Sequence, residues 1–260
     1  MIQLGTKAET LTALRGKLSS AVVLDAFVFT SHEWNTSELK ICDAIENKFA
    51  NKNTIIVRSS ASSEDTAESS NAGHFLSIGN LPLKNRTQYS EAIRKVIASY
   101  GNDSGKEQIL VQEHVGEIKL SGVAFSRDID TANDYFVINY DDVNNASDTV
   151  TGGSGSNLKT FYRWKHYTGA FDNPVMEKIV ALLQELETLT GIKGLDVEFA
   201  IDQNDRLILF QVRRLADAIR KDLVPADYND YLLKIYKIVQ KLNLPHPNLY
   251  VAKTLLGIMP

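Results

Sequence analysis

Residues 55–73 read Ile-Ile-Val-Arg-Ser-Ser-Ala-Ser-Ser-Glu-Asp-Thr-Ala-Glu-Ser-Ser-Asn-Ala-Gly, a short apolar run followed by a long polar one. The β-branched residues at its start predict a buried strand that ends on Arg58. Arginine offers a planar fork of donors to phosphate oxygens, and small side chains let backbone N–H groups approach an anion closely. The stretch therefore predicts a polyphosphate site, and the competing interpretation is a surface loop with Arg58 paired to Glu64 or Asp65.

Composition limits the functions that this chain can have. With 260 residues and 43% hydrophobic content, the chain can bury one large core or two smaller ones. Its formal net charge of -4 argues against a nucleic-acid-binding protein, which should carry a basic face. The single cysteine, Cys42, fits a reducing compartment. The sequence has no signal-peptide pattern and no apolar run near the about 18 residues of a membrane span, so we expect a soluble cytoplasmic protein.

The first part of the chain predicts alternating helices and strands. Lys7 falls in the first turn of a helix predicted within residues 4–15, where a cation gains nothing from the helix dipole but could reach toward an anion. A solvated surface lysine is the competing interpretation. Residues 22–29 predict one apolar strand, and residues 33–49 predict an amphipathic helix. The polar residues 101–106 interrupt this pattern and mark the expected boundary between two lobes.

The second part of the chain predicts a sheet covered by a helix. Strands are expected at residues 109–115, 121–127 and 135–139, and the second of them delivers Arg127 at its end. Residues 176–190 predict an amphipathic helix that closes on a glycine. A Gly- and Ser-rich stretch at residues 141–158 predicts a mobile loop.

Residues 194–214 read Gly-Leu-Asp-Val-Glu-Phe-Ala-Ile-Asp-Gln-Asn-Asp-Arg-Leu-Ile-Leu-Phe-Gln-Val-Arg-Arg and predict a β-hairpin. Strict alternation assigns one face of each strand to the following residues: Asp196, Glu198 and Ala200 on the first, and Leu207, Leu209, Gln211 and Arg213 on the second. Two carboxylates and an amide oxygen on adjacent strands form the all-oxygen donor set that Mg²⁺ prefers. In the competing interpretation, the acidic face meets water or pairs with Arg213.

Five ordered motifs resemble the ATP-grasp nucleotide-binding region of the pyruvate phosphate dikinase and phosphoenolpyruvate synthase family. They are Leu-Gly-Thr-Lys-Ala-Glu-Thr-Leu (4–11), Val-Arg-Ser-Ser-Ala-Ser-Ser-Glu-Asp (57–65), Leu-Val-Gln-Glu-His-Val (110–115), Ser-Gly-Val-Ala-Phe-Ser-Arg (121–127), and Asp-Val-Glu-Phe with Phe-Gln-Val-Arg-Arg (196–199 and 210–214). The resemblance runs from about residue 4 to residue 215. It implies an α+β, two-lobed ATP-grasp fold with a nucleotide cleft between the lobes, plus a C-terminal helical tail.

The resemblance also implies domain boundaries and roles for the matching residues. The lobes are expected at 1–105 and 106–216, the second holding the adenine and metal site, with a helical extension or linker at 217–260. The implied catalytic cations are Lys7, Arg58 and Arg127, with the loop up to Gly73 acting as a lid. The implied ATP contacts are Lys7, Arg58, Ser59, Ser60, Gln112, Glu113, His114 and Arg213, and the implied metal ligands are Glu198 and Gln211.

In this family, the β-phosphoryl group of ATP passes to a histidine on a swivelling domain and then to a small molecule, which leaves AMP and phosphate. The resemblance therefore implies ATP and Mg²⁺ as cofactors, and phosphohistidine and acceptor domains of a longer chain as partners. The apolar end of this sequence favours such a longer chain.

The final acceptor stays open between pyruvate, the glutamine amide and a rifamycin-type drug. Many relatives carry Gly-Leu-Gly-Glu where residues 139–145 read Asn-Tyr-Asp-Asp-Val-Asn-Asn, and this departure favours a divergent small-molecule kinase. Two other functions also stay open. One is a nucleotide-binding regulatory module without transfer chemistry, and the other is an ATP-grasp ligase that joins a carboxylate to an amine.

Overall fold

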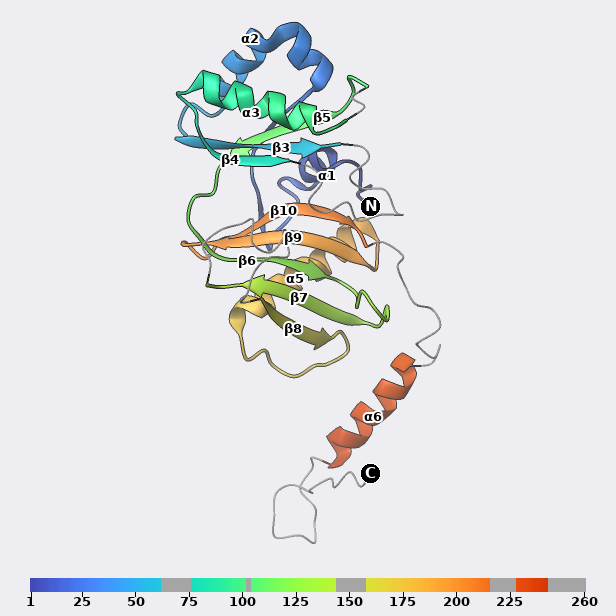
Figure 1. The fold of residues 1–260 in the computed structure, drawn as a ribbon. Helices are drawn as coiled ribbons and strands as arrows, with labels where there is room; N and C mark the ends of the chain where they lie inside the picture. The colour runs from blue at the N-terminus through green and yellow to red at the C-terminus, as the bar shows by residue number, and fades with distance from the viewer. Residues whose placement is uncertain (62–75, 102–103, 144–157, 216–227, 243–260) are drawn as a thin grey trace.

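The computed structural model describes residues 1–61, 76–101, 104–143, 158–215 and 228–242, and these form two β-sheets and five helices (Figure 1). The helices are α1 (Lys7–Leu14), α2 (Ser31–Lys48), α3 (Arg86–Ala98), α5 (Pro174–Thr190) and α6 (Tyr228–Leu242). The α+β class and the two-sheet arrangement expected of an ATP-grasp domain are confirmed. None of the described helices is long and apolar enough to cross a membrane. The predicted lid (up to Gly73) and most of the predicted loop at 141–158 lie outside the described residues.

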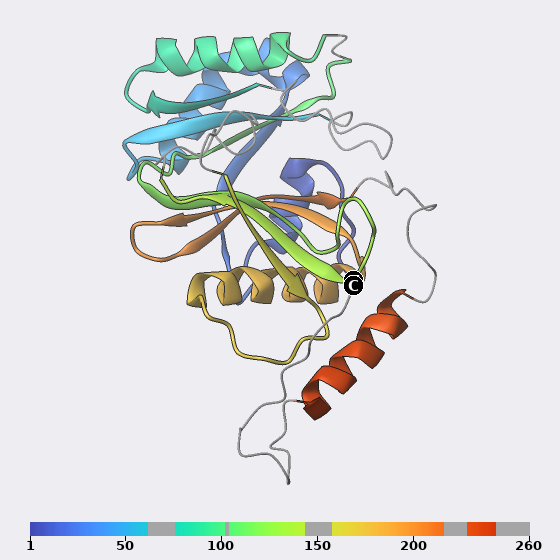
Figure 2. The ribbon, with the colours of Figure 1, turned by 60° about the horizontal axis from the view of Figure 1, so that its bottom comes forward.

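The two sheets lie face to face, each with helices on its outer side (Figure 2). The four-stranded sheet has the order β2 (Ala26–Thr30), β5 (Gln108–Glu113), β3 (Thr54–Ser60) and β4 (Ser77–Pro82). The six-stranded sheet has the order β1 (Val22–Val23), β10 (Leu207–Arg214), β9 (Leu195–Asp202), β6 (Ile118–Phe125), β7 (Tyr135–Asp141) and β8 (Lys159–Trp164). The layers follow in the order α2 with α3, the four-stranded sheet, the six-stranded sheet and α5. The short helix α1 lies near the inner faces of the two sheets.

Each sheet has its own hydrophobic core on its outer side. Between the four-stranded sheet and helices α2 and α3, this core includes Phe29, Trp34, Ile45, Ile55, Val57, Tyr89, Ile93 and Val111. The outer face of the six-stranded sheet packs on α5 through Phe136, Ile138, Ile179, Leu182, Leu183, Leu186, Val197, Phe199 and Ile201. Helix α5 closes on Gly191 in the left-handed conformation (φ 72°), as the sequence predicts.

Residues 22–29 do not form the single strand that their apolar character predicts. Val22–Val23 pairs with β10 in the six-stranded sheet, whereas Ala26–Thr30 pairs with β5 in the four-stranded sheet. The chain crosses between the sheets at Asp25, whose carboxylate accepts a hydrogen bond from its neighbour Ala26 N (2.7 Å) and meets Lys48 Nζ at 3.0 Å. A charged residue held by local bonds ends one strand before the next begins.

Strand β5 also differs from its expected place. The sequence pattern assigns this strand to the second lobe, after a boundary near residue 105. In the structure, β5 lies inside the four-stranded sheet, between β2 and β3. Alternation along a strand predicts its two faces but not its partners, so the assignment of β5 to the second lobe is wrong.

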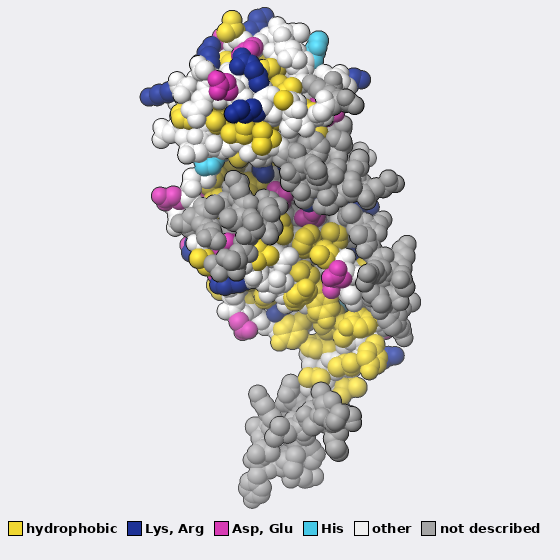
Figure 3. Space-filling view, viewed as in Figure 1, with side chains coloured by type: hydrophobic (Ala, Val, Ile, Leu, Met, Phe, Trp, Pro, Cys, Tyr) yellow, Lys and Arg dark blue, Asp and Glu magenta, His cyan; other side chains and the backbone are white. Residues whose placement is uncertain are grey.

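Helix α6 follows the six-stranded sheet and contacts it through Tyr236. The Tyr236 hydroxyl lies 3.1 Å from Thr168 Oγ1, and its ring meets Trp164 edge to face at 5.4 Å between centroids. Other apolar residues of α6, including Tyr231 and Ile238, are 60% and 57% exposed. Figure 3 shows this apolar surface over the lower part of the molecule.

Candidate functional site

The candidate site begins with Arg58, which β3 presents toward the six-stranded sheet. Its Nη2 lies 3.5 Å from Glu198 Oε2 of β9, and its Nη1 donates to the backbone oxygen of Phe210 in β10 at 3.4 Å. The guanidinium carbon lies 5.3 Å from the centre of the Phe210 ring. The side chains of Arg58 and Glu198 are only 11% and 16% exposed. Arg58 therefore joins the two sheets through a largely buried cation.

Arg58 keeps donor capacity that the protein does not use. Its Nε atom is buried and has no hydrogen-bond partner. A buried donor without an acceptor costs free energy, and such atoms are rare in native proteins. An anion placed beside Arg58 would satisfy this donor, which agrees with the phosphate role that the sequence predicts.

The predicted hairpin is confirmed, but its faces are not those that strict alternation gives. Strands β9 and β10 pair antiparallel, with an irregularity between Leu209 and Gln211. Leu209 lies opposite Phe199 and belongs to the apolar core, whereas Gln211 lies opposite Glu198. The extra residue, Phe210, forms a β-bulge, and a bulge shifts all later side chains to the other face. The prediction that Leu209 and Gln211 share a face is therefore wrong.

The bulge gathers oxygen donors on the face toward the four-stranded sheet. Glu198 and Gln211 are cross-strand neighbours, and Gln211 is only 3% exposed. One carboxylate and one amide oxygen suit a Mg²⁺ ion that takes its remaining ligands from phosphates and water. Within the described ranges, no group of three His, Cys, Asp or Glu side chains is arranged as a metal site. The donor set thus fits a metal held jointly with a phosphate ligand.

Two rungs further along the hairpin, Asp196 and Arg213 form a largely buried ion pair. Arg213 Nε donates to Asp196 Oδ2 at 2.6 Å, while Asp196 Oδ1 is buried without a hydrogen-bond partner. Burial raises the pKa of Asp196 above its usual value, and the charge of Arg213 only partly opposes this effect. The competing interpretation of the sequence, an acidic face paired with Arg213, therefore holds for Asp196, whereas Glu198 meets Arg58.

Lys7 is the first residue of α1, in the turn that the sequence predicts, and is only 7% exposed. Thr6 caps this helix and also donates from its hydroxyl to Gln108 Oε1 of β5 at 2.7 Å. On the other side of Lys7, the Ala8 backbone N–H donates to Ser60 Oγ at 2.9 Å. The structure therefore brings Lys7 next to the end of β3, two residues beyond Arg58.

The remaining predicted contacts on β3 and β5 divide between the two faces of the sheet. Gln112 faces the six-stranded sheet and is 1% exposed, and its amide nitrogen donates to Leu24 O at 3.4 Å. Glu113 lies opposite Ile55, on the face toward the helices, and pairs with Lys52. Ser59 alternates to the same outer face and is 1% exposed. Glu113 and Ser59 thus point away from Arg58.

His114 lies just beyond β5, beside the neighbouring strands. Its backbone N–H donates to Thr54 O at 3.0 Å. Its ring covers Gly79 of β4, where an added Cβ would lie 2.8 Å from His114 Cδ2. A glycine at this position allows the ring to pack on the strand.

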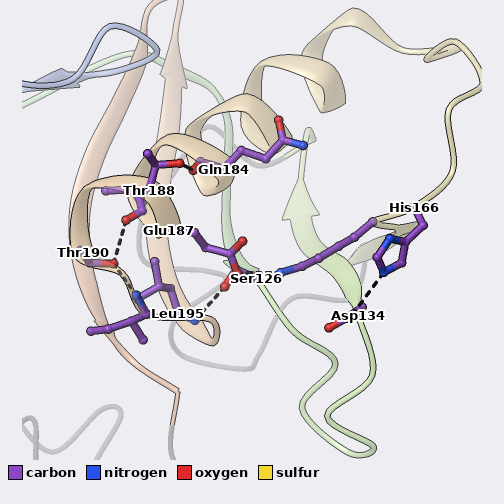
Figure 4. Close-up of polar contacts among 11 residues, drawn as sticks. Ser126, Asp134, His166, Gln184, Glu187, Thr188, Thr190 and Leu195 are labelled. Carbon is purple, nitrogen blue, oxygen red and sulfur yellow. Dashed lines mark hydrogen bonds and ion pairs between the residues drawn. The ribbon is translucent and has the colours of Figure 1, made fainter. Parts of the chain in front are cut away.

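Arg127 follows the end of β6, and its Nε atom is buried without a hydrogen-bond partner. The preceding residue, Ser126, accepts a hydrogen bond from Leu195 N at 2.9 Å (Figure 4), which ties the end of β6 to the start of β9. Among the described residues, neither the ion pair nor the hydrogen bond of Arg58 involves Arg127. Contacts within the structure thus join Arg58, Glu198 and Gln211 and hold Lys7 beside the end of β3.

Two features of the site are not apparent from the sequence pattern. Phe210 supplies both a backbone oxygen and an aromatic ring to Arg58. A phenylalanine at this position does not by itself predict a β-bulge. The ties from Thr6 and Ala8 to Gln108 and Ser60 span 102 and 52 residues, and local spacing carries no signal for such contacts.

Comparison with known proteins supplies a family for part of the chain. Residues 30–142 match the family described as "Pyruvate phosphate dikinase, AMP/ATP-binding domain". This range contains Arg58, Ser60, Gln112 and Arg127, while Lys7 and the β9–β10 hairpin lie outside it. No curated protein matches the chain.

Solved structures with a similar arrangement come from several enzymes. The D-alanine-D-alanine ligase from Coxiella burnetii gives a TM-score of 0.49 at 10% identity, over 90% of this chain and 60% of the ligase. ATP citrate lyase from Methanothrix soehngenii gives 0.49 at 11% identity, over 98% and 58% of the two chains. The D-alanine-D-alanine ligase from Helicobacter pylori gives 0.45 at 13% identity, over 90% and 58%. The chain spans about three fifths of the length of these structures.

The family match and the two-sheet fold agree with the resemblance that the five motifs predict. The match falls on the segment that contains Arg58 and the strands around it. The resemblance to the pyruvate phosphate dikinase family is thus confirmed, and it is residues 30–142 that match the AMP/ATP-binding domain of this family.

Proposed function

We propose that this chain binds MgATP between its two sheets and serves as the nucleotide-binding part of a dikinase-like phosphotransferase. The observation that carries the proposal is the contact of Arg58 with Glu198, at 3.5 Å across the sheets. This contact places a cation suited to binding phosphate beside a carboxylate suited to binding a metal ion. Arg58 comes from the four-stranded sheet and Glu198 from the six-stranded sheet.

The residues of this site suit the charge of the reaction. Phosphoryl transfer develops negative charge on the transferring oxygens, and fixed cations and Mg²⁺ neutralise it. Arg58 and Lys7 would bind phosphate oxygens, and Glu198 with Gln211 would hold the Mg²⁺. Arg213, already oriented by Asp196, would stay near the phosphates. A Mg²⁺ ion held by these two residues would supply positive charge that offsets the negative charge of the reacting group.

The finer part of the proposal concerns the acceptor. We infer that a histidine on a separate swivelling domain of a longer chain takes the β-phosphoryl group and passes it to a small molecule, such as the glutamine amide or pyruvate. Water takes the γ-phosphoryl group, so the other products are AMP and inorganic phosphate. Such a protein would work in the cytoplasm. The family match of residues 30–142 supports this chemistry over that of a ligase.

Calorimetric titration of the chain with ATP, with and without Mg²⁺, tests the nucleotide site. Wild-type protein should bind ATP in a Mg²⁺-dependent way, and Arg58→Ala and Glu198→Ala should each weaken binding at least about 30-fold, since each removes a charge-assisted contact. The matched controls are Arg94→Ala and Glu38→Ala, which remove an exposed ion pair on α3 and α2. Binding unaffected by the first two variants would contradict the site.

Product analysis of a full-length protein containing this chain tests the chemistry. AMP and phosphate in equal amounts would support the dikinase reaction. ADP as the sole nucleotide product, formed only with a carboxylate and an amine present, would instead favour the ligase. Tight MgATP binding without turnover in the full-length protein would favour a regulatory module.

A further inference from the structure

Ser60 lies at the end of β3, and its polar groups are engaged by the protein itself. Its side chain is fully buried, and its Oγ accepts a hydrogen bond from Ala8 N at 2.9 Å. Its backbone N–H donates to the Tyr100 hydroxyl at 3.4 Å, and that hydroxyl donates to Gln108 O at 2.6 Å. Ser60 is therefore embedded in a network of protein contacts.

Both residues that flank Lys7 connect to one rung of the four-stranded sheet. Ser60 and Gln108 are direct partners in the β3–β5 ladder. Ala8 donates to the side chain of Ser60, and Thr6 donates to the side chain of Gln108. A pair of bonds on either side of one residue restricts both the position and the rotation of its backbone.

These bonds bridge two parts of the molecule. Through Ala8, Leu11 and Leu14, helix α1 belongs to the same apolar cluster as the six-stranded sheet. The rung at Ser60 and Gln108 belongs to the four-stranded sheet, which also carries Arg58. The first turn of α1 is thus the place where Lys7 is fixed relative to Arg58.

We propose that Ser60 is a positioning residue, which holds the first turn of α1 so that Lys7 and Arg58 present their charges to the same phosphate group. The ligand in this proposal rests on the proposed function. Cations that are already in place avoid the cost of ordering when the anion arrives. Ser60 then acts on ATP through Lys7, rather than through the direct contact that the family resemblance implies.

A double-mutant cycle separates positioning from direct contact. Ser60→Ala should weaken MgATP binding about 10-fold in the wild-type background, but less than about twofold in a Lys7→Met background. A direct contact between Ser60 and ATP would give the same loss in both backgrounds and would overturn the proposal. Ser90→Ala is the matched control, because this serine of α3 is also buried, with its Oγ 3.6 Å from Cys42 Sγ in the outer helical layer, and should leave the affinity unchanged.

Amide hydrogen exchange tests the tie without any ligand. Ser60→Ala should speed exchange at the Ala8 N–H about 10-fold, because it removes the acceptor of that group. Gln108→Met removes the bond to Thr6 and should also speed exchange in this turn. This second variant tests the tie if Ser60→Ala fails to fold. Unchanged exchange at Ala8 in a folded Ser60→Ala variant would overturn the positioning role. Wild-type protein that fails to bind MgATP would overturn the proposed function alone, because the exchange result would still stand.

Discussion

The two faces of the six-stranded sheet differ sharply, although the same strands form both. The face toward α5 is apolar, and residues such as Val197, Phe199 and Ile201 are at most 2% exposed. The face toward the four-stranded sheet carries Asp196 and Glu198, taken alternately from the same strand. Charged groups so close to a core weaken stability unless they are paired.

This difference teaches that fold and chemistry are carried by alternate residues of one strand. The outer face supplies the burial that holds β9 and β10 in place. The inner face carries buried polar groups, including an unpartnered oxygen of Asp196, that add little to stability. Polar groups of this kind are retained most often at functional sites. Substitutions on the two faces should therefore have separable effects.

The largest effect should follow from Phe199→Ala on the outer face. Phe199 is 1% exposed and packs over Gly122, where an added Cβ would lie 2.9 Å from the Phe199 ring. Loss of the ring should lower the free energy of unfolding by about 3–5 kcal/mol. Urea denaturation measures this loss. Tyr162→Ala, at a 58% exposed aromatic residue of the same sheet, should cost well under about 1 kcal/mol.

Arg213→Met should come next, because it leaves the Asp196 carboxylate buried without its cation. Breaking such a pair costs about 3 kcal/mol at neutral pH. Burial raises the pKa of Asp196 in the folded protein, so its proton stabilises the fold below the unfolded value and that contribution is lost as pH rises through the folded pKa. The deficit of Arg213→Met should therefore shrink as pH falls. A deficit that is constant from pH 7 to pH 4 would contradict this account, and Asp196→Asn with Arg213→Met serves as the pH-independent control.

Asp202→Ala tests a second acidic residue of β9, which stabilises the fold when it is ionised. Its carboxylate accepts hydrogen bonds from Asn204 N and Arg206 N, both at 2.9 Å, and anchors the hairpin turn. Burial opposes ionisation, but the bonds from Arg206 and Asn204 lower the pKa of Asp202 below 3.8. Substitution should cost about 2 kcal/mol at neutral pH, a contribution that the wild-type protein loses as pH falls through the folded pKa.

Thermal unfolding from pH 7 to pH 2 measures the effect of Asp202→Ala. Asp205→Asn is the control from the same turn, because it removes the exposed ion pair with Lys119 and keeps a residue type that tolerates the left-handed backbone at this position (φ 58°). If the two variants lost the same stability, the anchoring role of Asp202 would be wrong.

Arg58→Met should produce the smallest effect, and in the opposite direction. In the unliganded protein, Arg58 lies 3.5 Å from Glu198, so it competes with a cation for that carboxylate. Removing Arg58 should strengthen binding of Mn²⁺ alone about 10-fold, or about 1.4 kcal/mol. Electron paramagnetic resonance of free Mn²⁺ measures this affinity in the absence of nucleotide. Arg94→Met should leave the affinity unchanged, and weaker binding by Arg58→Met would contradict the competition.

The parts of the fold that the sequence predicts are those with local causes. The strand that ends on Arg58, the helix that closes on Gly191 and the hairpin at 194–214 all follow from periodicity and turn residues. The place of β5 between β2 and β3 depends on pairing over long separations, which alternation does not encode. The same limit applies to the bond between Ala8 and Ser60, which spans 52 residues and leaves no signal in local spacing.

The bulge at Phe210 makes the two strands of the hairpin unequal in length by one residue. A deletion of one residue at this point could be absorbed by straightening β10, and Gln211 and Arg213 would keep their face. A one-residue insertion cannot be absorbed in this way, and it would turn the side chains of Gln211 and Arg213 toward the apolar layer. Across relatives of any length, β10 should thus accept single-residue losses near Phe210 far more readily than gains.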